Sequence, residues 1–261
     1  MAEQQGAGRW DFSGKVAVVT GGSDGIGKGV ALGFARAGAS VVIAARRPEK
    51  LAEAAEDLRA TGARVLTVPT DVSDAASVAN LAAATHAEFG RADVLVNNAG
   101  GSFGPTFRNG PLLELEEADF ATCLAVNVTS AFLVSKAFVP GMLERGSGAI
   151  INTGSVMAGD WRAPNAPLGV YATAKAALHK LTRVMALEWA PAVRVNCLSA
   201  GDIETPRVMA WRDPAEVAAT KAKIAMSRFG TPADLASLTL FLASDEAAWI
   251  TGSVIDINGG L

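Results

Sequence analysis

The chain has 261 residues, of which half are hydrophobic and 19% are charged, and its formal net charge is −3. This length suits one large α/β domain or two small ones, and the low charged fraction is typical of a well-buried chain or an oligomer. Because no basic block appears, we expect neither nucleic acid nor an anionic membrane as a partner.

The N-terminus and the cysteines indicate a cytoplasmic protein. Residues Met1–Ser13 lack the basic and apolar blocks of a signal peptide, and no apolar run reaches the length of a membrane span. Cys123 and Cys197 lie in apolar runs without metal-like spacing, which favours buried free thiols in a reducing compartment. His86 and His179 have no partner at a ligand spacing, so we read both as ordinary helix residues and expect no metal.

Short β-branched runs alternate along the chain with longer Ala- and Leu-rich stretches. Strands are expected, in chain order, at Lys15–Thr20, Val41–Ala45, Arg64–Pro69, Val94–Asn97, Ala149–Thr153, Val193–Leu198 and Val254–Ile257. Helices are expected between them at Ile26–Ala37, Lys50–Thr61, Ala75–Phe89, Glu117–Glu144 with a break, Tyr171–Trp189 and Pro232–Ser244. The strands are apolar on both faces, as in a sheet covered by helices. This rhythm predicts an α/β fold with a doubly wound, mainly parallel sheet and helices on both faces.

The chain shows no linker, repeat or low-complexity tract, so we predict one domain over residues 1–261 with a flexible segment at 1–13. The interval Gly201–Phe229 breaks the strand–helix rhythm and holds two prolines. In a doubly wound fold such a segment often covers the ligand crevice, and we take it as the substrate loop. Asp213-Pro214 and Thr231-Pro232 each predict a helix N-cap followed by a first-turn proline.

A glycine-rich turn follows the first expected strand. Its sequence, Thr20-Gly-Gly-Ser-Asp-Gly-Ile-Gly27, spaces glycines at 21, 25 and 27. Glycine lets the backbone turn sharply and approach a pyrophosphate, and the next helix presents N–H groups and a positive dipole end. A turn of this kind without a ligand is the alternative, but its place after the first strand of a β-α-β unit favours phosphate binding.

Tyr171 and Lys175 are four residues apart on an expected helix, so both side chains point to the same side. A nearby positive charge lowers the pKa of a phenol, which can then exchange a proton with a carbonyl or alcohol oxygen. Tyr171 is the only tyrosine in the chain. Ser155 stands at the carboxyl end of a strand, where serine either caps a turn or serves a site. Lys175 could alternatively be a solvated helix lysine.

These pieces together resemble the short-chain dehydrogenase/reductase family from about Gly14 to Gly260. The turn at Thr20–Gly27 is similar to the family's cofactor motif, and Asn97-Asn98-Ala99-Gly100 is similar to its motif after the fourth strand. The positions expected for its catalytic tetrad hold, in order, Asn127, Ser155, Tyr171 and Lys175. The resemblance implies a seven-stranded Rossmann-type sheet and a nicotinamide cofactor.

The resemblance also implies a role for each member of the tetrad. A ketone that receives hydride develops negative charge on oxygen and needs a proton and hydrogen-bond donors there. Tyr171 would be the acid in reduction and the base in oxidation, and Ser155 would polarise the substrate oxygen. Lys175 would lower the pKa of Tyr171 and bond the nicotinamide ribose. Asn127 would hold a water that links Lys175 to solvent.

The same motifs give a set of expected cofactor-binding residues: Gly21, Ser23, Asp24, Gly25, Ile26, Gly27, Arg46, Arg47, Asp71, Val72, Asn98, Ala99, Gly100, Tyr171, Lys175, Gly201, Ile203 and Thr205. Strand two ends at Ala45, where an acidic residue would bond the ribose hydroxyls and select NAD. Arg46 follows, and a guanidinium suits a 2′-phosphate. Asp24 acts against a phosphate by repulsion. We therefore predict NADP, with NAD as the alternative.

Two departures from the family pattern concern the substrate side. Sixteen positions separate Ser155 from Tyr171, more than is usual, and the extra length falls in Gly159–Gly169. The stretch Ser199–Asp202 stands where family members usually show Pro-Gly. Residues expected to line the pocket are Phe103, Met157, Trp161, Met209 and Trp211. Such an apolar lining suggests a ketone or secondary alcohol with hydrophobic bulk.

The predicted function is hydride transfer between NADP(H) and a small carbonyl or alcohol, with alternatives open. A 3-oxoacyl thioester reductase is one, because Arg207 and Arg212 could meet a phosphate or carboxylate, although we favour exposed lid residues. An NAD-dependent steroid or polyol dehydrogenase is another. A non-catalytic dinucleotide-binding sensor is opposed by the intact Ser-Tyr-Lys set. The end of the chain, at Ile250–Ser253 and Asn258–Gly260, resembles the family's tetramer-forming end and implies a homotetramer or homodimer.

Overall fold

The computed structural model describes residues 10–102, 107–159, 168–210 and 212–261. Its seven strands form one sheet in the order β3-β2-β1-β4-β5-β6-β7, and every neighbouring pair is parallel. The strands are β1 (Val16–Thr20), β2 (Ser40–Ala45), β3 (Val65–Pro69), β4 (Val94–Asn97), β5 (Gly148–Ser155), β6 (Val193–Ala200) and β7 (Val254–Ile257). The predicted doubly wound parallel sheet is confirmed.

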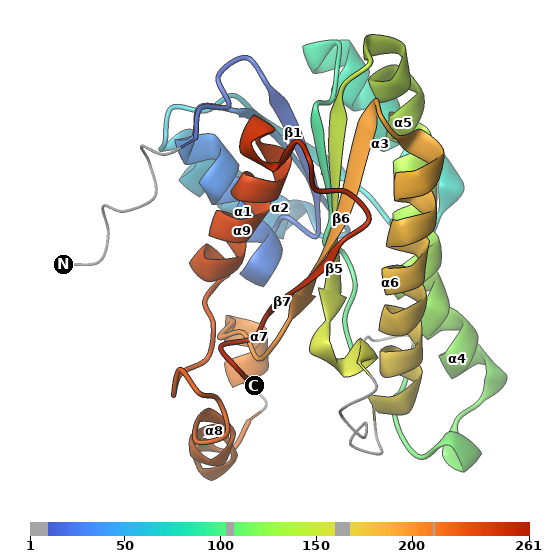
Figure 1. Cartoon of the computed structure of the whole chain (residues 1–261), viewed down its shortest axis with the longest axis vertical. Helices are drawn as coiled ribbons and strands as arrows, with labels where there is room; N and C mark the ends of the chain where they lie inside the picture. Colours follow the sequence, from blue (N-terminus) through green and yellow to red (C-terminus); the bar gives the residue numbers. More distant parts are fainter. Residues whose placement is uncertain (1–9, 103–106, 160–167, 211) are drawn as a thin grey trace.

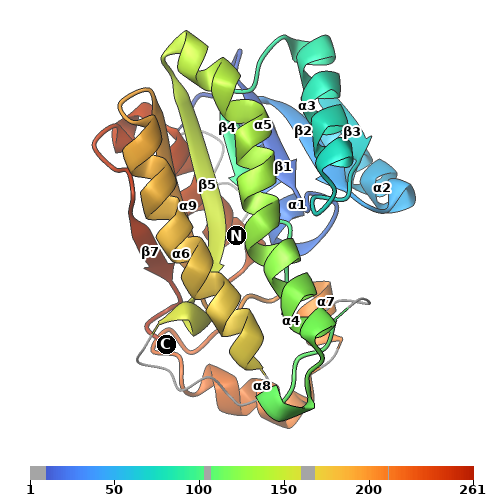
Figure 2. The ribbon, with the colours of Figure 1, turned by 90° about the vertical axis from the view of Figure 1, so that its right-hand side faces the viewer.

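Helices cover both faces of the sheet (Figure 1). One layer holds α1 (Gly25–Arg36), α2 (Pro48–Arg59) and α9 (Pro232–Ala243). The other holds α3 (Ala75–Phe89), α4 (Glu117–Leu124), α5 (Ser130–Arg145) and α6 (Gly169–Trp189), of which α5 and α6 cross the sheet together in Figure 2. Successive residues of β1 alternate between the two buried clusters: Ala17 and Val19 pack on one side, Val16 and Val18 on the other. Fully buried strands of this kind explain the continuous apolar runs.

The direction of the strand order reverses at β1, which lies between β2 and β4. Ala17 of β1 pairs with Val41 on one side and with Val94 on the other. Chains leaving β1 and β4 therefore diverge to opposite faces and open a crevice at the carboxyl edge of the sheet, where ligands of such folds bind. The glycine-rich turn, the stretch after β4 and the ends of β5 and β6 all meet at this edge.

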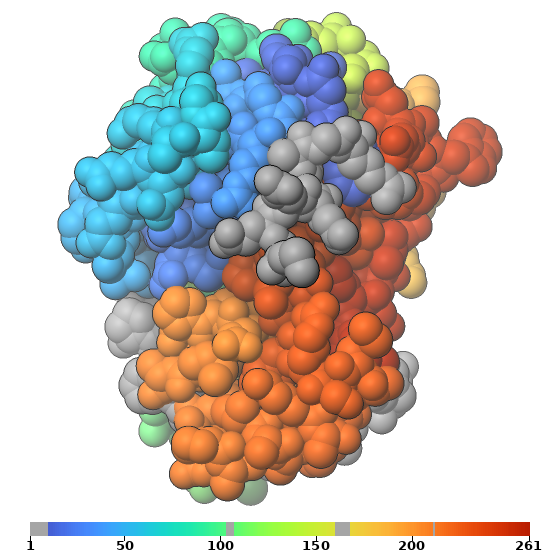
Figure 3. Space-filling model, turned by 90° about the vertical axis from the view of Figure 1, so that its left-hand side faces the viewer, coloured from blue at the N-terminus to red at the C-terminus, as the bar shows by residue number. Residues whose placement is uncertain are grey.

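Helix starts follow the expected capping chemistry. Asp213 accepts a hydrogen bond from the Ala215 N–H at 2.7 Å, and Pro214 begins α8 (Pro214–Lys221). Thr231 and Asp234 form a reciprocal capping box at the start of α9. Together with α7 (Pro206–Met209), α8 shows that the interval between β6 and α9 is partly helical; it forms the lower end of the molecule (Figure 3).

The long helix expected at Glu117–Glu144 does break, and the break is a π-helical turn over Ala125–Thr129. The continuous stretch Glu117–Arg145 has a mean hydropathy of 1.5 over its most apolar window, long and apolar enough to cross a membrane. This corrects the expectation that no run has that property. Because α5 packs against β4 and β5, the stretch serves here as a core helix of the fold.

Candidate active site

The glycine-rich turn joins β1 to α1 at the point where the strand order reverses. A Cβ on Gly27 would lie 2.2 Å from the Gly21 carbonyl oxygen, so only glycine permits this close turn. Asn98 donates from its amide to the carbonyls of Thr20 at 3.0 Å and Gly21 at 3.3 Å. The Thr20 hydroxyl in turn accepts the N–H groups of Asn98 and Ala99, both at 3.1 Å. These hydrogen bonds join the carboxyl end of β1 to the residues that follow β4.

The start of α1 presents its N–H groups to the crevice. Asp24 accepts the Gly25 N–H at 2.7 Å, and Gly25 has φ +51°, in the left-handed region that favours glycine. Thr205, from the segment after β6, lies opposite: its Cγ2 would be 3.3 Å from a Cβ on Gly25. Thr205 therefore lies close to the glycine-rich turn. The glycines of the turn and the N-terminus of α1 fit a pyrophosphate.

The predicted adenosine-side residues also come together. Arg46 and Arg47 are exposed directly after β2. The Asp71 carboxylate accepts hydrogen bonds from Ser73, and these bonds, with a smaller contribution from the Arg46 charge, lower its pKa. Val72 is buried beside this group. The structure thus brings the two sequence-distant sites, after β2 and after β3, to one end of the crevice.

On the opposite side of the crevice, β6 leads into Gly201 and Asp202, where the sequence departs from the family pattern. The Gly201 N–H donates to the Ile257 carbonyl at 3.0 Å, and Ile203 is buried. Asp202 forms an ion pair with Arg212, whose guanidinium also lies 5.2 Å from the centre of the Phe229 ring. Asp202 therefore ties the segment between α7 and α8 to the end of β6. Arg212 is held by protein partners, which differs from the exposed lid residue expected.

Lys175 is buried between α6 and β5 and donates to the Thr153 carbonyl at 2.7 Å. This placement excludes the alternative of a solvated helix lysine. Burial lowers the pKa of Lys175 to about 8, while the neighbouring Cys197 and Cys123 act in the opposite direction. The ammonium nitrogen lies 5.6 Å from the centre of the Tyr171 ring, so the pair expected from the sequence does share one site.

Ser155 is the last residue of β5 and stands beside Tyr171. Its hydroxyl oxygen accepts the Met157 N–H at 3.2 Å, so it caps a short turn as well as facing the site. Burial raises the pKa of Tyr171 to about 12, and the hydrogen bond with Ser155 only partly offsets that effect. The pKa of Tyr171 is thus raised where the sequence led us to expect a lowered value, because desolvation of the phenolate dominates.

Asn127 lies in the π-helical turn and is buried. Its amide donates to the carbonyls of Gly101 and Cys123, each at 3.0 Å, and its side-chain oxygen accepts the Gly101 N–H at 3.0 Å. A π turn inside a long helix is often a functional feature. These three hydrogen bonds brace the stretch after β4 against the π-helical turn. A Cβ on Gly100 would lie 2.7 Å from Asn127 Oδ1 and 3.6 Å from Lys175 Nζ, which puts all three groups in one place.

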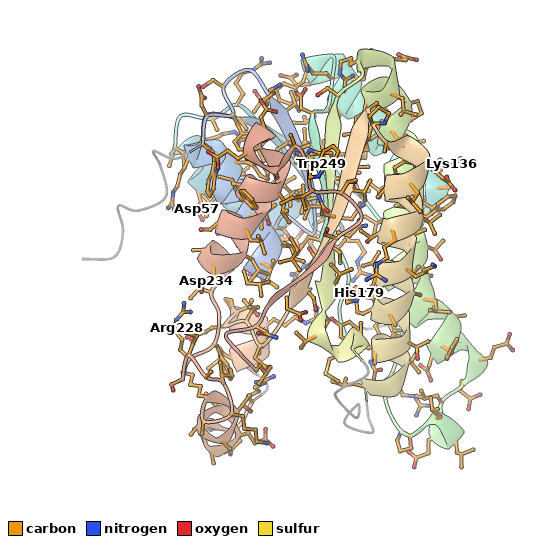
Figure 4. All side chains as sticks on the ribbon, in the orientation of Figure 1. Asp57, Lys136, His179, Arg228, Asp234 and Trp249 are labelled. Atoms are coloured by element: carbon orange, nitrogen blue, oxygen red, sulfur yellow. The ribbon has the colours of Figure 1, made fainter. Side chains whose placement is uncertain are left out.

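His179 is a site neighbour that the sequence interpretation missed. It follows Lys175 by four residues, the same spacing as Tyr171 to Lys175, and points from α6 toward the sheet (Figure 4). The Thr153 carbonyl was also missed, because no side-chain pattern signals a backbone acceptor. Among the expected pocket residues, Met157 and Met209 are half-buried, whereas Phe103, Trp161 and Trp211 lie outside the described residues.

Comparison with known proteins gives the family. A model described as enoyl-(acyl carrier protein) reductase matches residues 21–261. An uncharacterized oxidoreductase of Mycobacterium tuberculosis is 40% identical over 250 residues, covering 95% of this chain and 92% of the relative. The chain belongs to the short-chain dehydrogenase/reductase family. It is therefore an oxidoreductase of a family that binds NAD(P).

Solved structures of this family show both forms of the cofactor. A 7α-hydroxysteroid dehydrogenase complexed with NADH and 7-oxo glycochenodeoxycholic acid has a TM-score of 0.88 and 32% identity, covering 96% of this chain and 95% of that one. L-Sorbose reductase of Gluconobacter frateurii, complexed with NADPH and L-sorbose, has a TM-score of 0.87 and 34% identity, covering 96% and 97%. Short-chain dehydrogenase/reductase members similar to this chain thus act on small molecules of different classes.

Proposed function

We propose that the chain transfers hydride between NADP(H) and a ketone or secondary alcohol, with Tyr171 as the general acid and base. The observation that carries the proposal is the buried contact of Lys175 with Thr153, next to Ser155 and 5.6 Å from the Tyr171 ring. A solvated helix lysine would not be desolvated in this way. Burying an ammonium group costs free energy, and groups whose pKa is shifted by burial cluster at active sites.

In the proposed reaction a bound nicotinamide supplies or takes up the hydride, and the residues of the chain manage the proton and the charge. The Ser155 hydroxyl donates a hydrogen bond to the substrate oxygen, where negative charge develops. Tyr171 gives its proton to that oxygen in reduction and takes it in oxidation. Lys175 holds the dinucleotide ribose and balances the phenolate charge. Asn127 keeps the stretch after β4 in place beside Lys175.

The preference for NADP rests on the end of β2. Ala45 supplies no carboxylate for the ribose hydroxyls, and the exposed Arg46 offers a guanidinium to a 2′-phosphate. Asp71, near Arg46, and Asp24, which caps α1, carry the opposing charge. An Asp24 carboxylate engaged with the Gly25 N–H is held close to the helix start. NAD is the alternative for the same site.

The substrate is proposed to be an uncharged carbonyl compound or alcohol with hydrophobic bulk. The half-buried Met157 and Met209 support an apolar lining. The Asp202 carboxylate neutralises Arg212, which disfavours a thioester whose carrier phosphate would bind that guanidinium. A steroid or polyol dehydrogenase and a 3-oxoacyl thioester reductase remain the alternatives within the family, and a non-catalytic dinucleotide sensor is the alternative outside it.

We also propose a homotetramer or homodimer in the cytoplasm. Only 44% of the most apolar window in Glu117–Arg145 is buried within one chain. Large apolar side chains are exposed on α4, α5 and α6 and before β7: Phe120, Phe132, Leu143, Val184, Leu187 and Trp249. Apolar side chains that are exposed in one chain and come together on its surface mark interfaces, and these residues are the candidates for such a surface. Light scattering after size exclusion measures the assembly, and a monomer would contradict it. The two buried free thiols support a reducing compartment.

The test of the function is Tyr171→Phe, assayed with a panel of ketones and alcohols in the presence of NADPH or NADH. Loss of the acid–base group should lower kcat by about 10²- to 10⁴-fold. The dinucleotide dissociation constant, measured by nicotinamide fluorescence, should stay close to that of the wild type. A Tyr171→Phe protein with unchanged turnover would refute the mechanism. A wild type that binds dinucleotide but turns over no compound would favour the sensor.

A further inference from the structure

His179 fills the space between α6 and β5 directly behind the catalytic residues. It lies one helical turn beyond Lys175 on the face that also carries Tyr171. A Cβ on Gly154 would be 2.4 Å from His179 Nε2 and 2.9 Å from its Cδ2. The imidazole therefore sits directly on the β5 backbone, where only a glycine leaves it room.

Gly154 occupies a critical position on β5, between Thr153 and Ser155. The Thr153 carbonyl accepts the hydrogen bond from Lys175, and the Ser155 hydroxyl stands beside Tyr171. Both contacts bridge β5 and α6. The separation of strand and helix at Gly154 consequently determines whether both can form together.

The surroundings of the ring keep it uncharged. Its Nε2 is buried and finds no hydrogen-bond partner among the described residues. Burial, and next the positive charge of Lys175, lower the pKa of His179 to about 4; Asp256 of β7 opposes this shift, and Arg183 of α6 adds to it. The Cys197 thiol of β6 faces the same space, and burial raises its pKa to about 11. Near neutral pH the ring is therefore a neutral, flat spacer beside an ammonium.

We propose, on the basis of the function proposed above, that His179 is a positioning residue: its ring, seated on Gly154, sets the distance between α6 and β5 at which Lys175 reaches Thr153 and Tyr171 reaches Ser155. Along α6, the Lys175 contact lies about one turn from the ring and the Tyr171 contact about two turns from it. A smaller side chain would leave a cavity beside Lys175, and a cationic one would repel the ammonium. Displacements of about 1 Å at such a site cost on the order of 10²-fold in rate.

The test is a double-mutant cycle of Gly154→Ala and His179→Ala. Gly154→Ala drives a methyl group into the ring and should lower kcat by about 10- to 100-fold. His179→Ala should also lower kcat and weaken dinucleotide binding, since Lys175 loses its backing. In the double variant the methyl group introduced at position 154 no longer meets the ring, and the Cys197 thiol can turn into the space that the ring leaves, so kcat should recover at least about five-fold over Gly154→Ala alone. A double variant no better than Gly154→Ala would overturn the proposal.

Two comparison variants separate positioning from simple loss of stability. Met185→Ala creates a cavity further along α6, away from Gly154, and should lower the melting temperature while leaving kcat and its pH profile unchanged. In His179→Ala, water entering beside Lys175 should move the basic limb of the kcat profile to higher pH. Cys197 Sγ lies 2.7 Å from the Gly154 Cβ position, so Gly154→Ala/Cys197→Ala is also required. If this variant recovers activity and the His179 double variant does not, the spacer is Cys197 and the proposal fails.

A binding readout makes the test independent of turnover. The dinucleotide dissociation constant can be followed through the same cycle, even when no carbonyl compound is reduced and the proposed function itself fails. The chain has only two histidines, so selectively labelled imidazole signals report His179 directly, with the exposed His86 as the second signal. We expect the His179 signal to stay constant from pH 8 to about pH 5.5. Titration of that signal near the ordinary histidine pKa would overturn the neutral-spacer role.

Discussion

Asn127 offers the sharpest test of how the site is braced. Replacing it by alanine removes two donated hydrogen bonds and one accepted hydrogen bond, each of 3.0 Å, from a buried side chain. The Gly101 N–H and the carbonyls of Gly101 and Cys123 lose their partner. Leaving a buried polar group unsatisfied costs about 1–3 kcal/mol, and relaxation and water entry reduce the sum. We therefore expect Asn127→Ala to destabilise the protein by about 2–5 kcal/mol.

Asn127→Asp tests the donated hydrogen bonds separately from the volume of the side chain. Aspartate has the same shape but as a carboxylate cannot donate to either carbonyl. It would also place a negative charge near Lys175, because the position of Gly100 lies within reach of both groups. The Lys175 pKa should rise, and the basic limb of the kcat profile should move to higher pH. Asn127→Ala should leave that limb nearer to its place in the wild type.

Urea denaturation and steady-state kinetics measure both effects. Thr129→Ala is the matched control, because Thr129 is an exposed polar residue in the same π-helical turn. It should keep the wild-type urea midpoint and kcat. If Asn127→Ala unfolds at the same urea concentration as Thr129→Ala and retains full kcat, the three hydrogen bonds do not brace the site and the reasoning fails.

Three further substitutions test separate parts of the molecule. Arg46→Glu should reverse the preference to NADH, seen as at least about a ten-fold drop in the NADPH-to-NADH ratio of kcat/KM, and an unchanged ratio would exclude Arg46 from cofactor selection. Gly27→Ala should abolish dinucleotide binding measured by fluorescence, because its Cβ would lie 2.2 Å from Gly21 O. Arg194→Met should lower the melting temperature by roughly 4–12 °C, since the carbonyls of Leu242 and Ser244 that Arg194 bonds at the end of α9 lose their donor; wild-type stability would show that water replaces it.

The strand–helix rhythm was readable from the sequence because the five inner strands, β1, β2, β4, β5 and β6, are buried on both faces, and the partly buried edge strands β3 and β7 still carry apolar runs. β4, α3 and β7 begin and end where expected. β5 extends to Ser155, beyond the expected end at Thr153, because its last residues pair with the end of β6. Such pairing depends on a partner distant in sequence, so local composition cannot show it. The sequence analysis did not predict α7 in the interval after β6, because a single helical turn is too short to show a hydrophobic periodicity.

The sequence indicated which residues gather at the candidate site, but it indicated few of the contacts that they make there. Asn127, Ser155, Tyr171 and Lys175 meet as the motif order implied. The π-helical turn that aims Asn127 has no sequence signature, since it differs from an α-helix only in its hydrogen-bond partners. The sequence did not show the contact between His179 and Gly154, because that contact depends on how α6 is aligned against β5.

The pKa of Tyr171 indicates which direction of the proposed reaction, reduction or oxidation, the protein favours. Burial raises the pKa of Tyr171 to about 12, so near neutral pH the phenol keeps its proton and can donate it to a carbonyl. Oxidation of an alcohol requires the phenolate, which needs more positive charge nearby, and an oxidised nicotinamide ring carries one. Phenolate absorbance reports this group alone, because the chain has one tyrosine and Tyr171→Phe supplies the blank. We expect Tyr171 to titrate at lower pH with oxidised dinucleotide than with reduced dinucleotide or none. An identical titration in all three states would show that Tyr171 and the nicotinamide do not share a site.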